Sequence, residues 1–179
     1  GAGHKGAIGT YSVAMGLFNT ASGANSVAMG NSNTASGDNS VAFGNTAEAS
    51  GIESFAAGST TKASGVRSFA TGWKTEVKGD NSAGFGYNNT INGVNSVAMG
   101  NGSKVETNQS FAGGSGSTVT YSNNNTGDNS IAFGDVAQAV AASSAAFGKK
   151  TIAGGEQSLA FGNNAWATGD YSLAGGQGT

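Results

Sequence analysis

The residues of this chain that could do chemistry are few and poorly placed. His4 is the only histidine and cysteine is absent, so the usual nitrogen and sulfur ligands of a zinc site are lacking. Residues 1–6 have GxGxxG spacing, but a phosphate-binding loop needs a preceding strand and a following helix, and neither is predicted. Serines are abundant, but a Ser–His–Asp site has no base other than His4. We therefore expect no catalytic site, no cofactor and no bound metal.

Four aspartates recur two residues before a regularly repeated serine: Asp38, Asp80, Asp128 and Asp170. Calcium-binding β-solenoids carry the nonapeptide pattern GGxGxDxUx, which this chain lacks. We expect these carboxylates to cap turns or to lie in solvent.

The composition restricts the class of protein further. Glycine contributes 32 of 179 residues, proline and cysteine are absent, and only 10% of residues are charged. A net charge of −2 gives no basic field for nucleic acid or an anionic membrane. No apolar run approaches the ~20 residues that span a bilayer. The chain opens without a signal peptide, so we interpret it as a fragment of a longer protein.

A 14-residue repeat organises the whole sequence. A serine, here called the repeat serine, recurs in twelve copies, at 12, 26, 40, 54, 68, 82, 96, 110, 130, 144, 158 and 172. A glycine follows it by four residues in every copy, and a second glycine precedes it by three in ten, with Thr107 and Ala141 as departures. Fourteen residues suffice for two short strands and two tight corners, and stacked coils of this kind would extend roughly 55–60 Å. The sequence therefore predicts one all-β domain, a solenoid over residues 1–179.

Side-chain alternation assigns the two faces of each strand. Two residues after the repeat serine stands alanine in eleven copies, and Gly84 in the twelfth. Five residues before it stand mostly alanine or valine, whose outward neighbours include Thr20, Glu48 and Trp166. We expect the small residues inside and the mixed polar set in solvent.

The large apolar residues lie one and three positions after the repeat serine and must face outward. A monomer would expose this stripe far beyond a normal surface patch, so we expect another copy to cover it. Where one of the two positions is small the other is usually Phe, as in Phe69 with Thr71 and Ala83 with Phe85, which is typical of close packing. The predicted interface comprises Val13, Met15, Val27, Met29, Val41, Phe43, Phe55, Phe69, Phe85, Val97, Met99, Phe111, Ile131, Phe133, Phe147, Leu159, Phe161 and Leu173.

Two features break the repeat and are candidates for ligand contact. Trp73 and Tyr87 follow the constant glycine in successive coils, so we expect them side by side on the surface. Residues 115–129 make fifteen residues where other coils have nine, which predicts an inserted loop containing Tyr121. Binding at such a local site and weak binding distributed along the repeats both remain open.

The run Asn-Ser-Val-Ala-Met/Phe-Gly, as at residues 25–30, 39–44 and 95–100, resembles the head repeats of trimeric autotransporter adhesins of the YadA type. The resemblance covers essentially the whole chain. It implies a left-handed parallel β-roll, a homotrimer, and display on a bacterial surface through an outer-membrane anchor that this sequence lacks. It further implies adhesion to host extracellular matrix proteins or to cell-surface glycans and receptors. From the charge and the lack of a spanning run, we expect no contact of this chain with nucleic acid or membrane.

Two other classes of β-solenoid are alternatives. An ice-binding solenoid would carry a regular threonine array, and the mixed outward residues argue against it. A trimeric phage-type fibre that binds or cleaves glycans would need paired carboxylates in a groove, which are not evident.

Overall fold

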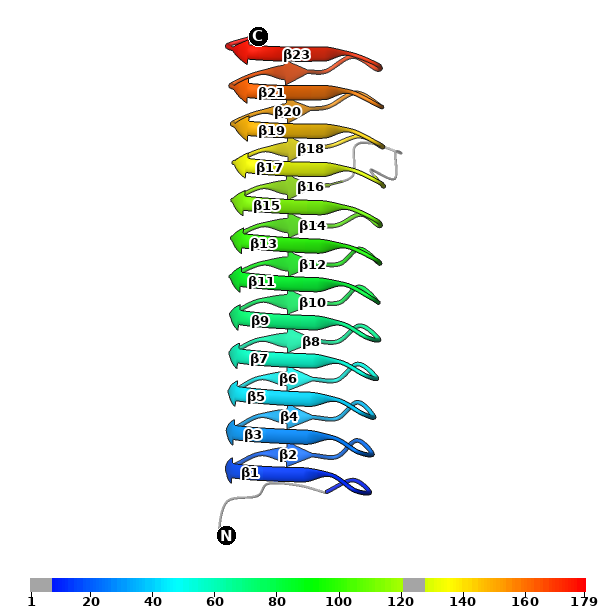
Figure 1. Ribbon diagram of the computed structural model, residues 1–179, viewed down its shortest axis with the longest axis vertical. Coiled ribbons are helices and arrows are strands. Elements are labelled where there is room, and N and C mark those ends of the chain that lie inside the picture. Colours follow the sequence, from blue (N-terminus) through cyan, green and yellow to red (C-terminus); the bar gives the residue numbers. More distant parts are fainter. Residues whose placement is uncertain (1–7, 121–127) are drawn as a thin grey trace. The chain divides into compact units, whose positions relative to one another are not determined.

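The computed structural model describes residues 8–120 and 128–179. The chain forms two compact units, Gly1–Asn88 and Asn89–Thr179, and both follow the same plan. Each turn of the chain has a five-residue long strand and, on the opposite layer, a two-residue short strand (Figure 1). No helix occurs among the described residues. The prediction of an all-β parallel solenoid with 14-residue coils is confirmed.

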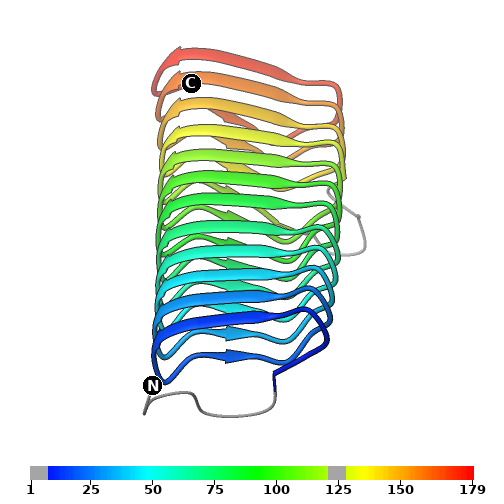
Figure 2. The ribbon, with the colours of Figure 1, turned by 60° about the horizontal axis from the view of Figure 1, so that its bottom comes forward.

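The long strands make one layer and the short strands the other (Figure 2). The first unit holds β1 (Val13–Leu17), β3 (Val27–Asn31), β5 (Val41–Asn45), β7 (Phe55–Ser59), β9 (Phe69–Trp73) and β11 (Ala83–Tyr87), with β2 (Thr20–Ala21), β4 (Thr34–Ala35), β6 (Glu48–Ala49), β8 (Lys62–Ala63) and β10 (Glu76–Val77). The second unit holds β13 (Val97–Asn101), β15 (Phe111–Ser115), β17 (Ile131–Asp135), β19 (Ala145–Lys149), β21 (Leu159–Asn163) and β23 (Leu173–Gln177), with β12 (Thr90–Ile91), β14 (Lys104–Val105), β16 (Thr118–Val119), β18 (Gln138–Ala139), β20 (Ile152–Ala153) and β22 (Trp166–Ala167).

Within each unit, neighbouring coils pair in parallel and in exact repeat register. Val13 pairs with Val27 one coil on, 14 residues away. Phe111 pairs with Ile131, 20 residues away, at the same repeat position. The extra residues between these two coils therefore do not shift the register. Because β15 and β16 continue the regular coil as far as Val119, the insertion is narrower than the expected range 115–129.

A tight turn leads into each long strand. In the turn from Gly23 to Ser26, the Ser26 amide and its hydroxyl both donate to the Gly23 carbonyl, at 3.3 and 2.7 Å. Asn25, directly before the repeat serine, has a φ of 53°. Such a positive φ in the second half of a turn favours Asn or Gly, which explains the recurrent Asn-Ser pair.

The constant glycines are required by contact between coils. Gly30, at the end of a long strand, has a φ of +118°, and a Cβ there would clash with the Gly44 carbonyl oxygen of the next coil. Gly23 has no such φ, but a Cβ there would clash with the Gly37 carbonyl. A side chain in place of Gly30 or Gly23 would force these coils to shift, although the second position holds Thr107 and Ala141 in two other coils.

The core between the two layers consists of small side chains. Ala28 and Ala42 from long strands are fully buried, as are Ala21 and Ala35 from short strands. Val77 and the other largest buried aliphatic residues all come from short strands. The layers are thus close together, as the sequence predicted, and the bulky residues lie elsewhere.

Candidate functional site

The outward face of the long strands carries the large apolar residues. In β5 the Phe43 side chain is 53% exposed and Val41 is half-buried, whereas Ala42 between them is fully buried. In β17 Phe133 is 52% exposed with the same alternation. The predicted outward orientation of the stripe is confirmed in both units. We call this surface, formed by the positions one and three after the repeat serine, the apolar face.

Aromatic rings on the apolar face pack against rings of the neighbouring coils. Phe55 and Phe69 stack with centroids 4.8 Å apart, and Phe85 lies against Phe69 at 5.4 Å. The residues beside these rings are small: Ala57 follows Phe55 by two positions, and Ala83 is the register partner of Phe69. The first unit therefore has three rings in a row, of which Phe55 and Phe69 stand one residue after the repeat serine and Phe85 stands three residues after it.

The second unit shows the same exchange of volume. Phe111 and Phe133 stack at 6.2 Å on either side of Gly113. A Cβ at Gly113 would clash with both rings, and a Cβ at Gly175 would clash with Phe161. The predicted exchange of volume between neighbouring positions is therefore a property of the folded face.

Trp73 and Tyr87 meet at the end of two paired long strands, β9 and β11. The two residues are register partners, and their rings stack with centroids 4.3 Å apart at 16°. Lys74 Nζ lies 4.3 Å from the Trp73 ring centroid. Trp73 is half-buried and Tyr87 is 50% exposed. The expected neighbourhood of Trp73 and Tyr87 is confirmed. Tyr121 and the residues around it, the other candidate contact, lie outside the described part of the chain.

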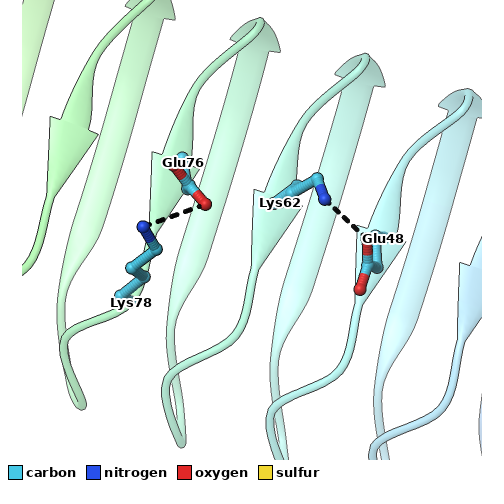
Figure 3. Close-up of polar contacts among 4 residues, drawn as sticks. All are labelled: Glu48, Lys62, Glu76 and Lys78. Atoms are coloured by element: carbon cyan, nitrogen blue, oxygen red, sulfur yellow. Dashed lines mark ion pairs between the residues drawn. The ribbon is translucent and has the colours of Figure 1, made fainter.

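The outward face of the short strands is polar and its charges are mostly paired. Lys62 Nζ lies 3.1 Å from Glu48 of the previous coil, and Lys78 lies 3.3 Å from Glu76 (Figure 3). In the second unit Lys104 pairs with Glu106 at 2.5 Å. These pairs are solvent-exposed, so each adds at most about 1 kcal/mol to stability. Because these charges are paired, the short-strand face has little net electrostatic field.

The recurrent aspartates cap backbone groups. Asp38 Oδ1 accepts a hydrogen bond from the Ala24 amide of the preceding coil at 2.9 Å. Asp80, Asp128 and Asp170 do the same for Val66, Asn108 and Glu156, at 2.8–2.9 Å. The turn-capping interpretation is confirmed for all four.

The repeat pattern did not lead us to expect a ladder of buried asparagines. Asn33 Nδ2 donates to the Met29 and Gly44 carbonyls, both at 2.8 Å, and its Oδ1 accepts from the Ala47 amide at 2.8 Å. Asn19 makes the equivalent bonds one coil earlier. The available signal was a small polar residue recurring seven positions after the repeat serine.

Other signals for chemistry are limited. His4 and the GxGxxG stretch at residues 1–6 fall outside the described residues. Within residues 8–120 and 128–179, no three His, Cys, Asp or Glu side chains are grouped so that they could hold a metal ion. The same ranges contain no helix that is long and apolar enough to cross a membrane.

Comparison with known proteins identifies one family. A family model described as two copies of the YadA head domain repeat matches residues 7–33, 21–47, 49–75, 92–117, 126–151 and 153–179. No curated protein matches the chain. The matched segments cover well over half of the sequence and coincide with the coils of both units. This family is a structural adhesin domain and not a known enzyme family. The chain belongs to the YadA head domain repeat family and is an adhesin-type head.

Proposed function

We propose that three copies of this head assemble through their apolar faces and attach a bacterium to host cells or extracellular matrix. The YadA-type family consists of surface autotransporters anchored in the bacterial outer membrane, which supports a position at the cell surface. Matrix proteins or cell-surface glycans and receptors are the partners.

The apolar face is the observation that carries the proposal. Met15, Phe43, Phe133 and Phe161 are each about half exposed in a single chain, at repeat positions shared by coils of both units. Soluble monomers rarely expose contiguous apolar surface on this scale. A second and third copy would remove it from water, which supplies the free energy of assembly. The number three is taken from the family.

Assembly is tested by placing a charge on the apolar face. Met99→Asp should abolish the trimer, because an unpaired carboxylate buried between copies costs several kcal/mol. Lys104→Asp is the matched control, since Lys104 lies in the same coil on the short-strand face. Its trimer should persist. Light scattering on the parent and both variants measures the mass, and a folded, soluble parent monomer would refute the assembly.

Attachment is tested separately with the intact trimer. Binding of the parent head to host cells and to a panel of matrix proteins should be saturable, and Met99→Asp should lose it through loss of multivalency. A trimer that binds neither cells nor any matrix protein would contradict the adhesive role while leaving the assembly intact.

A further inference from the structure

The corner at the end of β9 combines an aromatic stack with an unpaired cation. Tyr87 covers one face of the Trp73 indole at 4.3 Å, so the Lys74 ammonium, 4.3 Å from the ring centroid, lies over the opposite face. That face points toward Ser59 of the preceding coil, the other register partner of Trp73. Because Ser59 is small, the stack of Trp73 and Tyr87 does not continue into the preceding coil. The Lys74 ammonium lies over the indole on that side.

The charge of Lys74 is uncompensated within the described residues. Lys62, Lys78, Lys104 and Lys149 each have a carboxylate within 4 Å. Across residues 8–120 and 128–179, no carboxylate forms an ion pair with Lys74, whose ammonium lies over the indole. Lys74 itself is exposed, so its ammonium is weakly held over the ring and a ligand can replace it there.

The surroundings of Lys74 add hydrogen-bonding groups. Thr60 and Asn88 occupy the same turn position one coil before and one coil after, and both are exposed. The three residues have φ values of 51–58°, so they stand at the tips of three successive, identically shaped turns. The backbone bonds Lys74 N–H to Ser59 O at 3.0 Å and Asn88 N–H to Trp73 O at 2.7 Å hold these turns in place.

We propose that this corner binds an acidic saccharide, a pyranose ring that bears a carboxylate or a sulfate; the inference rests on the adhesive role proposed above and names a ligand class for it. The C–H face of the sugar packs on the free face of the indole, whose electron-rich surface attracts it. The Lys74 ammonium moves off the ring and forms a charge-assisted hydrogen bond with the anionic group. Thr60 and Asn88 supply partners for sugar hydroxyls.

A saccharide fits this corner better than an acidic peptide does. The aromatic surface is one indole face beside a turn, which matches the area of a single sugar ring. A peptide bound by strand addition would need a free sheet edge, and β9 is paired on both sides, with β7 and β11.

The test is calorimetric titration of the trimeric head with two acidic probes and their neutral counterparts. A sialyllactose tests the carboxylate form against lactose, and a heparin-derived hexasaccharide tests the sulfated form against maltohexaose. At least one acidic probe should bind, with both neutral sugars at least about tenfold weaker. A pentaglutamate peptide serves as the third anionic probe, and binding of it alone would overturn the proposal.

Matched variants locate the site. Lys74→Ala should weaken acidic-probe binding about 5–10-fold and flatten its salt dependence, and Lys74→Arg should retain most of it. Trp73→Ala should weaken it at least about tenfold. Lys150→Ala is the control, because Lys150 is exposed at the same turn position, with a φ of 53°, beside Lys149 instead of an aromatic ring. It should bind as the parent does.

Three outcomes would overturn the site. These are equal loss in Lys74→Ala and Lys150→Ala, no binding of either acidic probe, and a Trp73→Ala head that loses trimer stability while its glycan affinity is unchanged. The third outcome would indicate that Trp73 contacts another copy in the trimer instead of a saccharide. A head that attaches to cells but shows any of these results refutes only the saccharide site, whereas loss of all attachment by the parent refutes the adhesive role.

Discussion

At the scale of single residues, side-chain hydrogen bonds at the corners join one coil to the next. The aspartates cap amides on the exposed turn, and the buried asparagines serve carbonyls and amides at the opposite corner. Both sets include hydrogen bonds between successive coils. A coil therefore depends on its neighbours for its polar groups as well as for its strand pairing, as expected for a repeat protein.

We predict that Asn33→Ala destabilises the head by about 1–3 kcal/mol. The change removes four side-chain hydrogen bonds and leaves the buried Ala47 amide without its acceptor. Asn31→Ala is the control, because Asn31 lies in the same coil with its side chain exposed. Chemical denaturation measures both. An equal effect of the two changes would show that the ladder contributes nothing specific.

At the scale of the elements, each long strand makes two surfaces of different character. Its inward alanines allow the two layers to approach closely, and its outward residues make the ring contacts of the apolar face. Since the inner positions are nearly invariant between coils, variation in volume is confined to the outer ones. At these outer positions, a large residue one after the repeat serine usually goes with a small residue three after it, and the reverse.

Phe69 offers a test of that balance. Phe69→Ala should cost about 3–5 kcal/mol per chain in the assembled head, because it removes a ring that stacks on Phe55 and packs at a tilt against Phe85. Adding Thr71→Phe should recover much of the loss, since it recreates the Ala83 and Phe85 pairing of the next coil. Thermal melting of single and double variants measures this.

The control for this pair is Phe18→Ala, which removes an exposed ring at a turn outside the apolar face. It should lower the melting temperature much less than Phe69→Ala. A double variant that melts no higher than Phe69→Ala would show that the two positions do not share a packing space.

At the scale of the whole chain, the insertion is accommodated without loss of register. On its two sides, the Ser130 amide donates to the Ser110 hydroxyl at 3.1 Å, and Asp128 caps Asn108, as equivalent groups do elsewhere. The solenoid scaffold therefore tolerates extra residues at this corner.

Deleting residues 121–126 restores the 14-residue step between Ser110 and Ser130. We expect the trimer and its melting temperature to be nearly unchanged, because surface-loop length has a small effect on stability. Light scattering and thermal melting provide the measurement, and a fall of more than about 10 °C would contradict it. Cell binding by the shortened head then shows whether the insertion takes part in attachment.

The sequence by itself determined the coil, its register and the direction of its side chains. Gly30 and Ala28 recur at fixed steps because backbone sterics and layer spacing are the same in every coil, so period alone identifies their roles. The apolar face followed from the same alternation. The assignment of the chain to its family rested on the repeat motif, which the family model matches.

Only the tertiary structure decided how side chains in neighbouring coils meet. The stacking of Trp73 on Tyr87, the position of Lys74 over the indole face that Tyr87 leaves uncovered and the bonds of Asn33 all depend on rotamers. A rotamer is selected by the atoms around it, and here several of those atoms belong to the next coil, such as the Tyr87 ring beside Trp73 and the Ala47 amide beside Asn33. A repeat pattern specifies which positions are neighbours, but the contacts they make are determined by packing in three dimensions.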